Sequence, residues 1–265
     1  MHPLERYRGG WALVTGSARA IGLGFTFARQ VAEHGINIVL VDIDGEQLQE
    51  RSAELAAAYR VQVRSIAVDL GRLEDYPSMY QQVDDIDIDV LICNHMYTPK
   101  DTPEILDMPL AVHNSMLDIN ARAYVNLIHH FGAEMRRRDR GAIIVVSSGA
   151  GLTSAPYTAA YSANKAFQIA FAEALSFELR HTAVDVLIMV AGLMNTQGDG
   201  LSKYPKWQIA EPADAAAETL RALGRKLLVM PGWPNRLQTL LMTRGMSRAR
   251  AVRSVGAFMA KGLGK

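Results

Sequence analysis

Short runs of apolar, β-branched residues recur along this chain, and each is followed by a longer stretch whose apolar positions have helical spacing. Several runs are apolar throughout rather than alternating, which is typical of strands covered on both faces of a sheet. The predicted strands are Trp11–Thr15, Asn37–Val41, Val61–Val68, Val90–Cys93, Ala142–Ser147, Val184–Val190 and Lys226–Met230. Helical segments are predicted at residues 20–34, 45–59, 104–137, 158–181 and 211–224.

The order of these elements predicts a single domain of the α/β class. Strands that alternate with helices are typical of a doubly wound parallel sheet with helices on both faces. The connections are too short for a second domain, so we expect this domain to span residues 1–232 and a helical tail to occupy 233–265. Ligands bind beyond the carboxyl ends of the strands in such sheets, so the residues just after each strand are the candidates for chemistry.

Composition narrows the class of protein. Of the 265 residues, 49% are apolar and 21% are charged, which excludes a disordered chain, a collagen-like repeat and a disulfide scaffold. The single cysteine, Cys93, is expected to be a small core residue in a reducing compartment. No stretch approaches the ~20 apolar residues that span a bilayer, and the charged start does not resemble a secretion signal. We therefore expect a soluble, cytoplasmic protein.

The charge is distributed unevenly along the chain. The net charge is +1, yet ten basic residues and no acidic residue follow Glu218. This balance argues against a general nucleic-acid binder and leaves a local role for the tail. We expect Gly245 to divide the tail into two helices, because glycine costs ~1 kcal/mol in a helix interior. Three roles remain open: a helix that closes over the substrate, a subunit contact, or a basic surface that binds anionic membranes.

A loop rich in small residues follows the first predicted strand. It reads Thr15-Gly16-Ser17-Ala18-Arg19-Ala20-Ile21-Gly22-Leu23-Gly24 and leads at once into a helix. Small residues let backbone N–H groups approach a pyrophosphate, and the positive end of the helix favours the anion. The generic G-x-G-x-x-G pattern is not present, so a tight turn that merely needs glycine is the alternative.

Two carboxylates follow the second predicted strand. Asp42 lies 20 residues after Gly22, where a carboxylate can accept hydrogen bonds from an adenosine ribose and repel a 2′-phosphate. A helix cap is the other role open to an acid here, and Asp44 suits it better. We therefore assign Asp42 to the ribose and favour NAD over NADP, although the Arg19 guanidinium could bind a 2′-phosphate.

The fifth predicted strand leads into a serine, and a Tyr-x-x-x-Lys pair follows. Ser148 follows the strand, and Tyr161 and Lys165 lie on one face of a predicted helix because they are four residues apart. A free phenol has a pKa of ~10, too high for a base at neutral pH. A nearby ammonium stabilises the phenolate, which is the change that general acid/base chemistry needs. The spacing alone is a weak signal, but its position after the strand and serines strengthens it.

These motifs together resemble the short-chain dehydrogenase/reductase family, from about residue 10 to residue 230. Thr15, Gly16 and Gly22 match the family pattern T-G-x-x-x-G-x-G, with Ala20 in place of its middle glycine. The family's P-G-x-x-x-T segment reads Ala191-Gly192-Leu193-Met194-Asn195-Thr196, and its N-N-A-G segment reads Cys93-Asn94-His95-Met96. These departures bear on cofactor affinity and loop geometry and leave the proton-transfer residues intact.

The resemblance implies a Rossmann-type fold and an NAD(P)-dependent enzyme that interconverts an alcohol and a ketone. Tyr161 would move the proton, Lys165 would bind the nicotinamide ribose, Ser148 would orient the substrate oxygen, and Asn120 would anchor a water next to Lys165. The residues expected to bind the cofactor are Gly16, Ser17, Arg19, Ile21, Gly22, Asp42, Asp69, Leu70, Asn94, Tyr161, Lys165, Met194 and Thr196.

The substrate end of the site is expected to be apolar, beneath a lid at residues 197–210. The candidate pocket residues are His95, Tyr97, Leu152, Tyr157, Tyr204 and Trp207. They favour a bulky apolar alcohol or ketone. A hydrogen-bonded structural role is the more common one for a histidine such as His95. We expect no metal, because Asp84–Asp89 lacks the glycine and distal glutamate of a calcium loop and is interpreted as a solvated acidic stretch.

Two other functions remain open. A cofactor-free, dehalogenase-like lyase on the same fold would carry arginine in place of Lys165 and would lose the glycine loop. A non-catalytic dinucleotide sensor would not need the full set of Asn120, Ser148, Tyr161 and Lys165, and all four are present. The resemblance also implies a homodimer or homotetramer.

Overall fold

The structure, a computed structural model, describes residues 1–99, 104–196 and 206–263. Within these residues a seven-stranded sheet forms the centre of the molecule, with every pair of neighbours parallel and the order β3-β2-β1-β4-β5-β6-β7. The strands are β1 (Trp11–Thr15), β2 (Asn37–Asp42), β3 (Val63–Ala67), β4 (Ile88–Cys93), β5 (Gly141–Ser148), β6 (Val184–Ala191) and β7 (Leu228–Val229). The strand order reverses between β1 and β4, and a doubly wound sheet binds its ligand at such a point.

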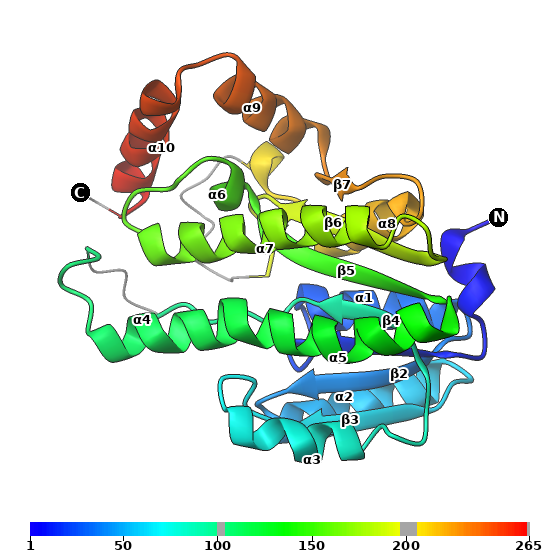
Figure 1. Cartoon of the computed structure of the whole chain (residues 1–265). Helices are drawn as coiled ribbons and strands as arrows, with labels where there is room; N and C mark the ends of the chain where they lie inside the picture. Colours follow the sequence, from blue (N-terminus) through cyan, green and yellow to red (C-terminus); the bar gives the residue numbers. More distant parts are fainter. Residues whose placement is uncertain (100–103, 197–205, 264–265) are drawn as a thin grey trace.

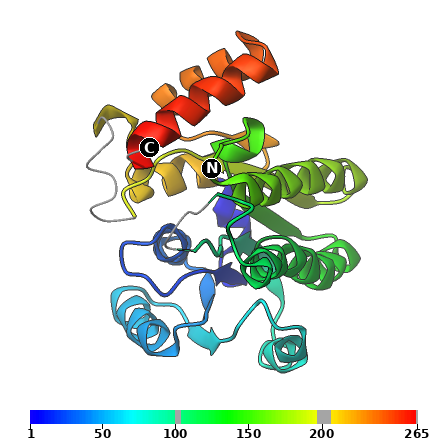
Figure 2. The same cartoon turned by 90° about the vertical axis from the view of Figure 1, so that its left-hand side faces the viewer.

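Helices cover both faces of the sheet (Figures 1 and 2). One apolar cluster joins the sheet to α1 (Leu23–Glu33), α2 (Gly45–Ala58) and α8 (Pro212–Ala222). The other joins it to α3 (Tyr76–Gln81), α5 (Ala123–Arg138) and α7 (Ala159–Glu178). Successive side chains of β5 enter opposite clusters, because side chains alternate along a strand. Shorter elements are η1 (Pro3–Tyr7), η2 (Leu73–Asp75), α4 (Leu110–Leu117), η3 (Asp118–Arg122), α6 (Gly149–Leu152) and η5 (Lys206–Gln208).

The predicted α/β fold is confirmed, with differences at several elements. The predicted helix over 104–137 begins only at Leu110 and is interrupted by η3, a π-helical turn. Helix α3 and the short helix η1 were not predicted, because each is too short to show a clear apolar period. Cys93 is fully buried, as predicted.

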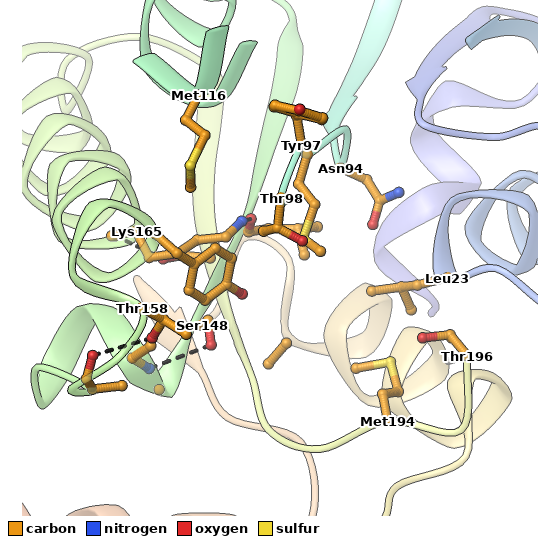
Figure 3. A pocket seen from close by; sticks show the side chains of 18 of the residues that line it. Leu23, Asn94, Tyr97, Thr98, Met116, Ser148, Thr158, Lys165, Met194 and Thr196 are labelled. Atoms are coloured by element: carbon orange, nitrogen blue, oxygen red, sulfur yellow. Dashed lines mark hydrogen bonds between the residues drawn. The ribbon is translucent and has the colours of Figure 1, made fainter. Parts of the chain in front are cut away.

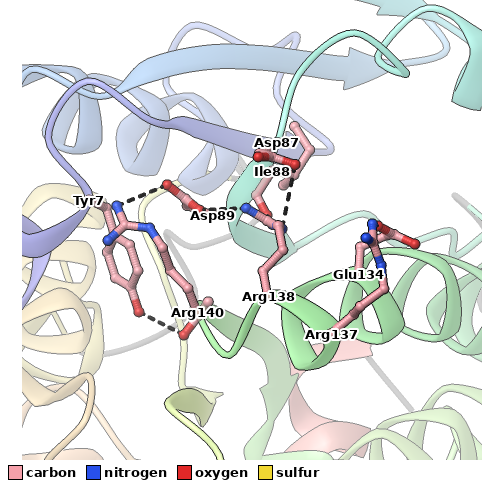
Figure 4. A network of polar contacts seen from close by, with 9 residues as sticks. Tyr7, Asp87, Ile88, Asp89, Glu134, Arg137, Arg138 and Arg140 are labelled. Atoms are coloured by element: carbon pink, nitrogen blue, oxygen red, sulfur yellow. Dashed lines mark hydrogen bonds and ion pairs between the residues drawn. The ribbon is translucent and has the colours of Figure 1, made fainter.

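The buried carboxylate of Asp89 forms ion pairs at the amino ends of the central strands, shown in Figure 4. Asp89 is only 4% exposed and pairs with Arg138 and Arg140, each at 3.1 Å. The Tyr7 hydroxyl donates a 2.6 Å hydrogen bond to the carbonyl of Gly141 beside them. The interpretation of the whole Asp84–Asp89 stretch as solvated was therefore wrong at Asp89. Its carboxylate is buried because two arginines reach it, Arg138 from the end of α5 and Arg140 from the connection to β5.

The tail forms two helices, α9 (Trp233–Arg244) and α10 (Arg248–Leu263), and the break after α9 lies at Gly245 as predicted. Figure 1 shows both helices, in orange and red, beyond β7 and above α6. Both helices lie near the carboxyl ends of the strands. Among the described residues no helix is long and apolar enough to cross a membrane.

Candidate active site

A cleft of about 1710 Å³ opens at the carboxyl ends of the strands. Gly16 follows β1, Asp42 ends β2, Asn94 follows β4, Ser148 ends β5 and Met194 follows β6, and all five line this cleft. Figure 3 shows Ser148 and Lys165 on one side, facing Leu23, Asn94, Met194 and Thr196 on the other. Common ligand pockets have volumes of about 300–1,000 Å³, so this cleft has room for a large cofactor and a second molecule.

The turn between β1 and α1 requires glycine for steric reasons. Gly16 has φ +67°, and a Cβ there would lie 2.9 Å from the Cα of His95. A Cβ on Gly24 would collide with the carbonyl oxygen of Gly16. The loop therefore packs directly against the segment that follows β4.

The start of α1 is suited to an anion. The helix begins at Leu23 after the extended residue Gly22, and no side chain caps its first N–H groups. Gly22 and Leu23 both line the cleft, so these donors and the positive end of the helix dipole face it. This arrangement, with the size of the cleft, fits a dinucleotide whose pyrophosphate lies at the helix start.

The two acids at the end of β2 have different contacts, and Asp44 is the helix cap, as predicted. Asp44 caps α2 by accepting a 3.0 Å hydrogen bond from Gln47 N. Asp42 accepts hydrogen bonds from Ala18 N at 2.9 Å and Ile43 N at 2.8 Å. The Asp42 carboxylate therefore holds the loop after β1 while it also lines the cleft, beside the exposed Arg19.

Helix α7 places Tyr161 and Lys165 on the face that lines the cleft. The Lys165 Nζ lies 5.7 Å from the centroid of the Tyr161 ring, and Lys165 is only 2% exposed. Burial lowers the pKa of Lys165 to about 7, because an ammonium is less stable away from water. Burial raises the pKa of Tyr161, and a hydrogen bond with Ser148 acts in the opposite direction.

Asn120 lies in the π-helical turn and is completely buried. Its side chain forms two 2.7 Å hydrogen bonds with the backbone of Tyr97, one from Tyr97 N and one to Tyr97 O. The backbone carbonyl oxygen of Asn120 accepts a 2.8 Å hydrogen bond from Gln168 Nε2. Gln168 Oε1 in turn accepts a 3.0 Å hydrogen bond from Lys165 Nζ. Sequence reasoning missed Gln168. The available signal was a glutamine three residues after Lys165, among apolar residues of the same helix.

His95 is 6% exposed, and its ring lies 4.4 Å from the Tyr124 ring, centroid to centroid, at an angle of 36°. Its Nδ1 lies 2.7 Å from Thr15 Oγ1, an oxygen that also accepts from the backbone N–H groups of Asn94 and His95. Burial and the nearby Lys165 lower the pKa of His95 to about 3, so the ring is neutral. Its Nε2 has no hydrogen-bond partner among the described residues. These contacts support the structural role expected for this histidine.

Most predicted site residues meet in the cleft. Those that line it are Gly16, Arg19, Gly22, Asp42, Asp69, Leu70, Asn94, His95, Tyr97, Ser148, Tyr157, Tyr161, Lys165, Met194 and Thr196. Predicted residues that the structure describes away from its wall are Ser17, Ile21, Asn120, Leu152 and Trp207. Ser17 is turned inward, where its hydroxyl joins β1 to β2, and Leu152 packs on the core. Tyr204 and most of the predicted lid, residues 197–205, lie outside the described residues.

The tail contributes to the cleft as well. Gln238 and Met242 from α9 line it, as do Val255, Phe258 and Met259 from α10. Gly256 of α10 lies so close to Pro156 that a Cβ there would be 3.0 Å from the proline ring. The described residues contain no cluster of three or more His, Cys, Asp or Glu side chains arranged for a metal ion.

Known proteins that resemble this chain are dehydrogenases and reductases. The family described as short chain dehydrogenase matches residues 10–203. A 7beta-hydroxysteroid dehydrogenase of Mediterraneibacter gnavus is 26% identical over 264 residues, which covers 96% of this chain and 97% of that protein. A structure from work on the stereoselectivity of 7beta-hydroxysteroid dehydrogenase aligns with a TM-score of 0.88 at 24% identity, over 96% of this chain and 99% of that one.

Two further solved structures are described with a bound cofactor. A metagenomic short-chain oxidoreductase in complex with NADP is 26% identical, with a TM-score of 0.71, over 84% of this chain and 98% of that one. An NAD⁺-bound xylitol dehydrogenase is 28% identical, with a TM-score of 0.65, over 72% of both chains. Similar proteins therefore hold either dinucleotide.

Proposed function

Because the chain belongs to the short chain dehydrogenase family, and so is an oxidoreductase that acts on CH–OH groups, we propose that it interconverts a bulky, apolar secondary alcohol and its ketone. The observation that carries the proposal is the meeting of Ser148, Tyr161 and Lys165 at one cleft that is large enough for a dinucleotide and a substrate. The M. gnavus relative is named as an enzyme of a hydroxysteroid, which is a bulky, largely apolar secondary alcohol.

Each polar group of this set has a defined task in the proposed reaction. The nicotinamide ring supplies the hydride acceptor or donor when the cofactor is bound. In oxidation the Tyr161 oxygen takes the proton of the substrate hydroxyl, and in reduction it returns a proton to the carbonyl oxygen. The Lys165 ammonium stabilises the phenolate, and the Ser148 hydroxyl donates a hydrogen bond to the substrate oxygen.

A panel of secondary alcohols and ketones, assayed by absorbance with NAD and NADP in parallel, tests this proposal. We expect turnover to be fastest with bulky apolar substrates, since Met194, Met242, Val255 and Phe258 line the substrate end of the cleft. Binding of a cofactor without turnover of any alcohol or ketone would contradict the proposal and favour a dinucleotide sensor.

The cofactor preference is proposed to be for NAD, through Asp42. We expect Asp42→Asn to improve NADP binding relative to NAD by about tenfold, because the 2′-phosphate no longer meets a negative charge. Asparagine retains an acceptor for Ala18 N, so the loop contact of 2.9 Å can persist, whereas Asp42→Ala removes the charge and the contact together. The measurement is the ratio of the two cofactor dissociation constants, by fluorescence titration. A wild-type protein that already binds NADP more tightly would overturn this choice and make Arg19 the phosphate partner.

The tail is proposed to cover the substrate end of the cleft. Truncation after Gly232 removes Gln238, Met242, Val255 and Phe258 from the cleft wall, so we expect the substrate KM to rise several-fold. The affinity for NAD should change little, because the phosphate end of the cleft is formed by β1 and α1. Phe258→Ala is the smaller test, and it should raise KM in the same direction.

Thermal unfolding of the truncated protein shows whether the domain of residues 1–232 folds by itself. Light scattering tests the predicted homodimer or homotetramer, and cosedimentation with anionic liposomes tests a membrane contact of the basic tail. If the truncated protein kept the wild-type KM and the wild-type number of subunits, both a lid and a subunit contact would be contradicted.

A further inference from the structure

The Lys165 ammonium is held by two neutral oxygens. Its Nζ donates hydrogen bonds to the carbonyl oxygen of Val146, at 2.9 Å, and to Gln168 Oε1, at 3.0 Å. Lys165 is 2% exposed and Gln168 is 1% exposed, so water contributes little to either group. No carboxylate of the described residues pairs with Lys165, which leaves the two oxygens as its polar support.

The orientation of the Gln168 amide is dictated by its two neighbours. Its Nε2 donates a 2.8 Å hydrogen bond to the carbonyl oxygen of Asn120, which can only accept. The Lys165 ammonium can only donate, so the amide oxygen must face it. Gln168 therefore joins η3 to α7 and directs its dipole at the ammonium.

Other titratable groups around Lys165 do not replace this support. Tyr161 lies on α7, Tyr124 on α5, and His95 follows β4. Burial raises the pKa of both tyrosines, and the pKa of His95 is about 3, so all three are neutral near pH 7. A neutral amide oxygen is thus the side-chain group that stabilises the charge on Lys165. An amide does not exchange a proton with an ammonium in this range, so Gln168 can support the Lys165 charge but cannot pass a proton on as the water predicted at Asn120 would.

We propose that Gln168 is a positioning residue that holds the Lys165 ammonium in its charged form and in place beside Tyr161. The proposal rests on the function proposed above for Tyr161 and Lys165. It assigns to Gln168 the contact between Asn120 and Lys165 that sequence reasoning assigned to a water.

Two substitutions of similar size make opposite predictions. Gln168→Met removes the acceptor, so the charged form of Lys165 loses support and its titration midpoint should fall by about one pH unit. Gln168→Glu places a carboxylate beside the ammonium, so the midpoint should rise by about one pH unit or more. A role in packing alone would leave the midpoint of Gln168→Met at its wild-type value, whereas the charge of Gln168→Glu raises the midpoint in either case.

The direct measurement is carbon-13 NMR of protein labelled at the lysine ε-carbon, titrated from pH 5 to 10. The chain has seven lysines, and the signal that disappears in Lys165→Met identifies Lys165. The measurement needs neither cofactor nor substrate. A failure of the proposed function, seen as absent turnover, is therefore separate from a failure of this inference, seen as an unchanged midpoint.

Asn164→Leu is the matched control. Asn164 is also a buried amide on α7, but its Nδ2 donates a 3.3 Å hydrogen bond to the carbonyl of Met116 and not to an acceptor of the Lys165 ammonium. We expect this variant to lose thermal stability and to keep the wild-type Lys165 midpoint. Should Gln168→Met fail to fold, Gln168→Leu takes its place, because leucine removes the same acceptor without adding a charge. Equal midpoints in wild type and the folded Gln168→Met or Gln168→Leu variant would overturn the proposal.

In an active preparation the pH profile of ketone reduction gives a second readout. Reduction requires the charged form of Lys165, so the rate should fall as pH rises through the Lys165 midpoint. This alkaline limb should move to lower pH in Gln168→Met and to higher pH in Gln168→Glu, while Asn164→Leu leaves it in place.

Discussion

Tyr161→Phe is expected to lower kcat by about a thousandfold, because the phenol oxygen is the group that moves the proton to or from the substrate. The ring remains and packs as before, so the fold and the dissociation constant of the cofactor should change little. Steady-state kinetics with the best substrate of the panel, together with a fluorescence titration of NADH, measures both quantities.

Tyr80→Phe is a suitable control for the loss of a phenol. Tyr80 packs on α5, and its hydroxyl donates to the carbonyl of Asn126 at 3.2 Å, away from the residues that line the cleft. This variant should keep wild-type kcat and lose only a little stability. A Tyr161→Phe enzyme with turnover near that of the control would show that the assigned general acid/base is wrong.

Lys165→Met is expected to impair two properties at once. Loss of the ammonium should lower kcat by about a hundredfold or more, because the Tyr161 phenolate loses its stabilising charge. It should also weaken cofactor binding by about 10- to 100-fold, since a hydrogen bond from a charged group contributes about 1.5–3 kcal/mol. Methionine retains the unbranched chain, so the packing of α7 is disturbed little.

Lys165→Met should also remove the dependence of cofactor affinity on pH. The pKa of Lys165 is about 7, so the wild-type ammonium is present below that pH and is lost as pH rises through it. Affinity for NADH should therefore fall with rising pH in the wild type, and the curve should be flat in Lys165→Met. An identical pH dependence in the two proteins would mean that Lys165 does not contact the cofactor.

Features set by neighbours in the chain were predictable from the sequence. Tyr161 and Lys165 share a face because they are four residues apart on α7, and Asp44 caps α2 because it directly precedes that helix. The strands were recognisable because both faces of a parallel sheet are covered, so β1 and β4 are buried along their whole length and consist mainly of apolar residues. These relations depend only on the geometry of one helix or one strand.

Contacts between distant segments were decided by the tertiary structure. Gln168 meets Asn120, 48 residues earlier in the chain, only because α7 packs against η3. Asp89 looks like part of an acidic surface stretch until Arg138 and Arg140 come to bury it. The side chains of α10 reach the cleft because the chain turns back over it after β7. A helical period shows which face of a segment is apolar, but it does not show which other segment packs against that face. The spacing of Lys165 from Tyr161 therefore follows from the sequence, whereas the groups that surround Lys165 follow from the packing of α7 in the tertiary structure.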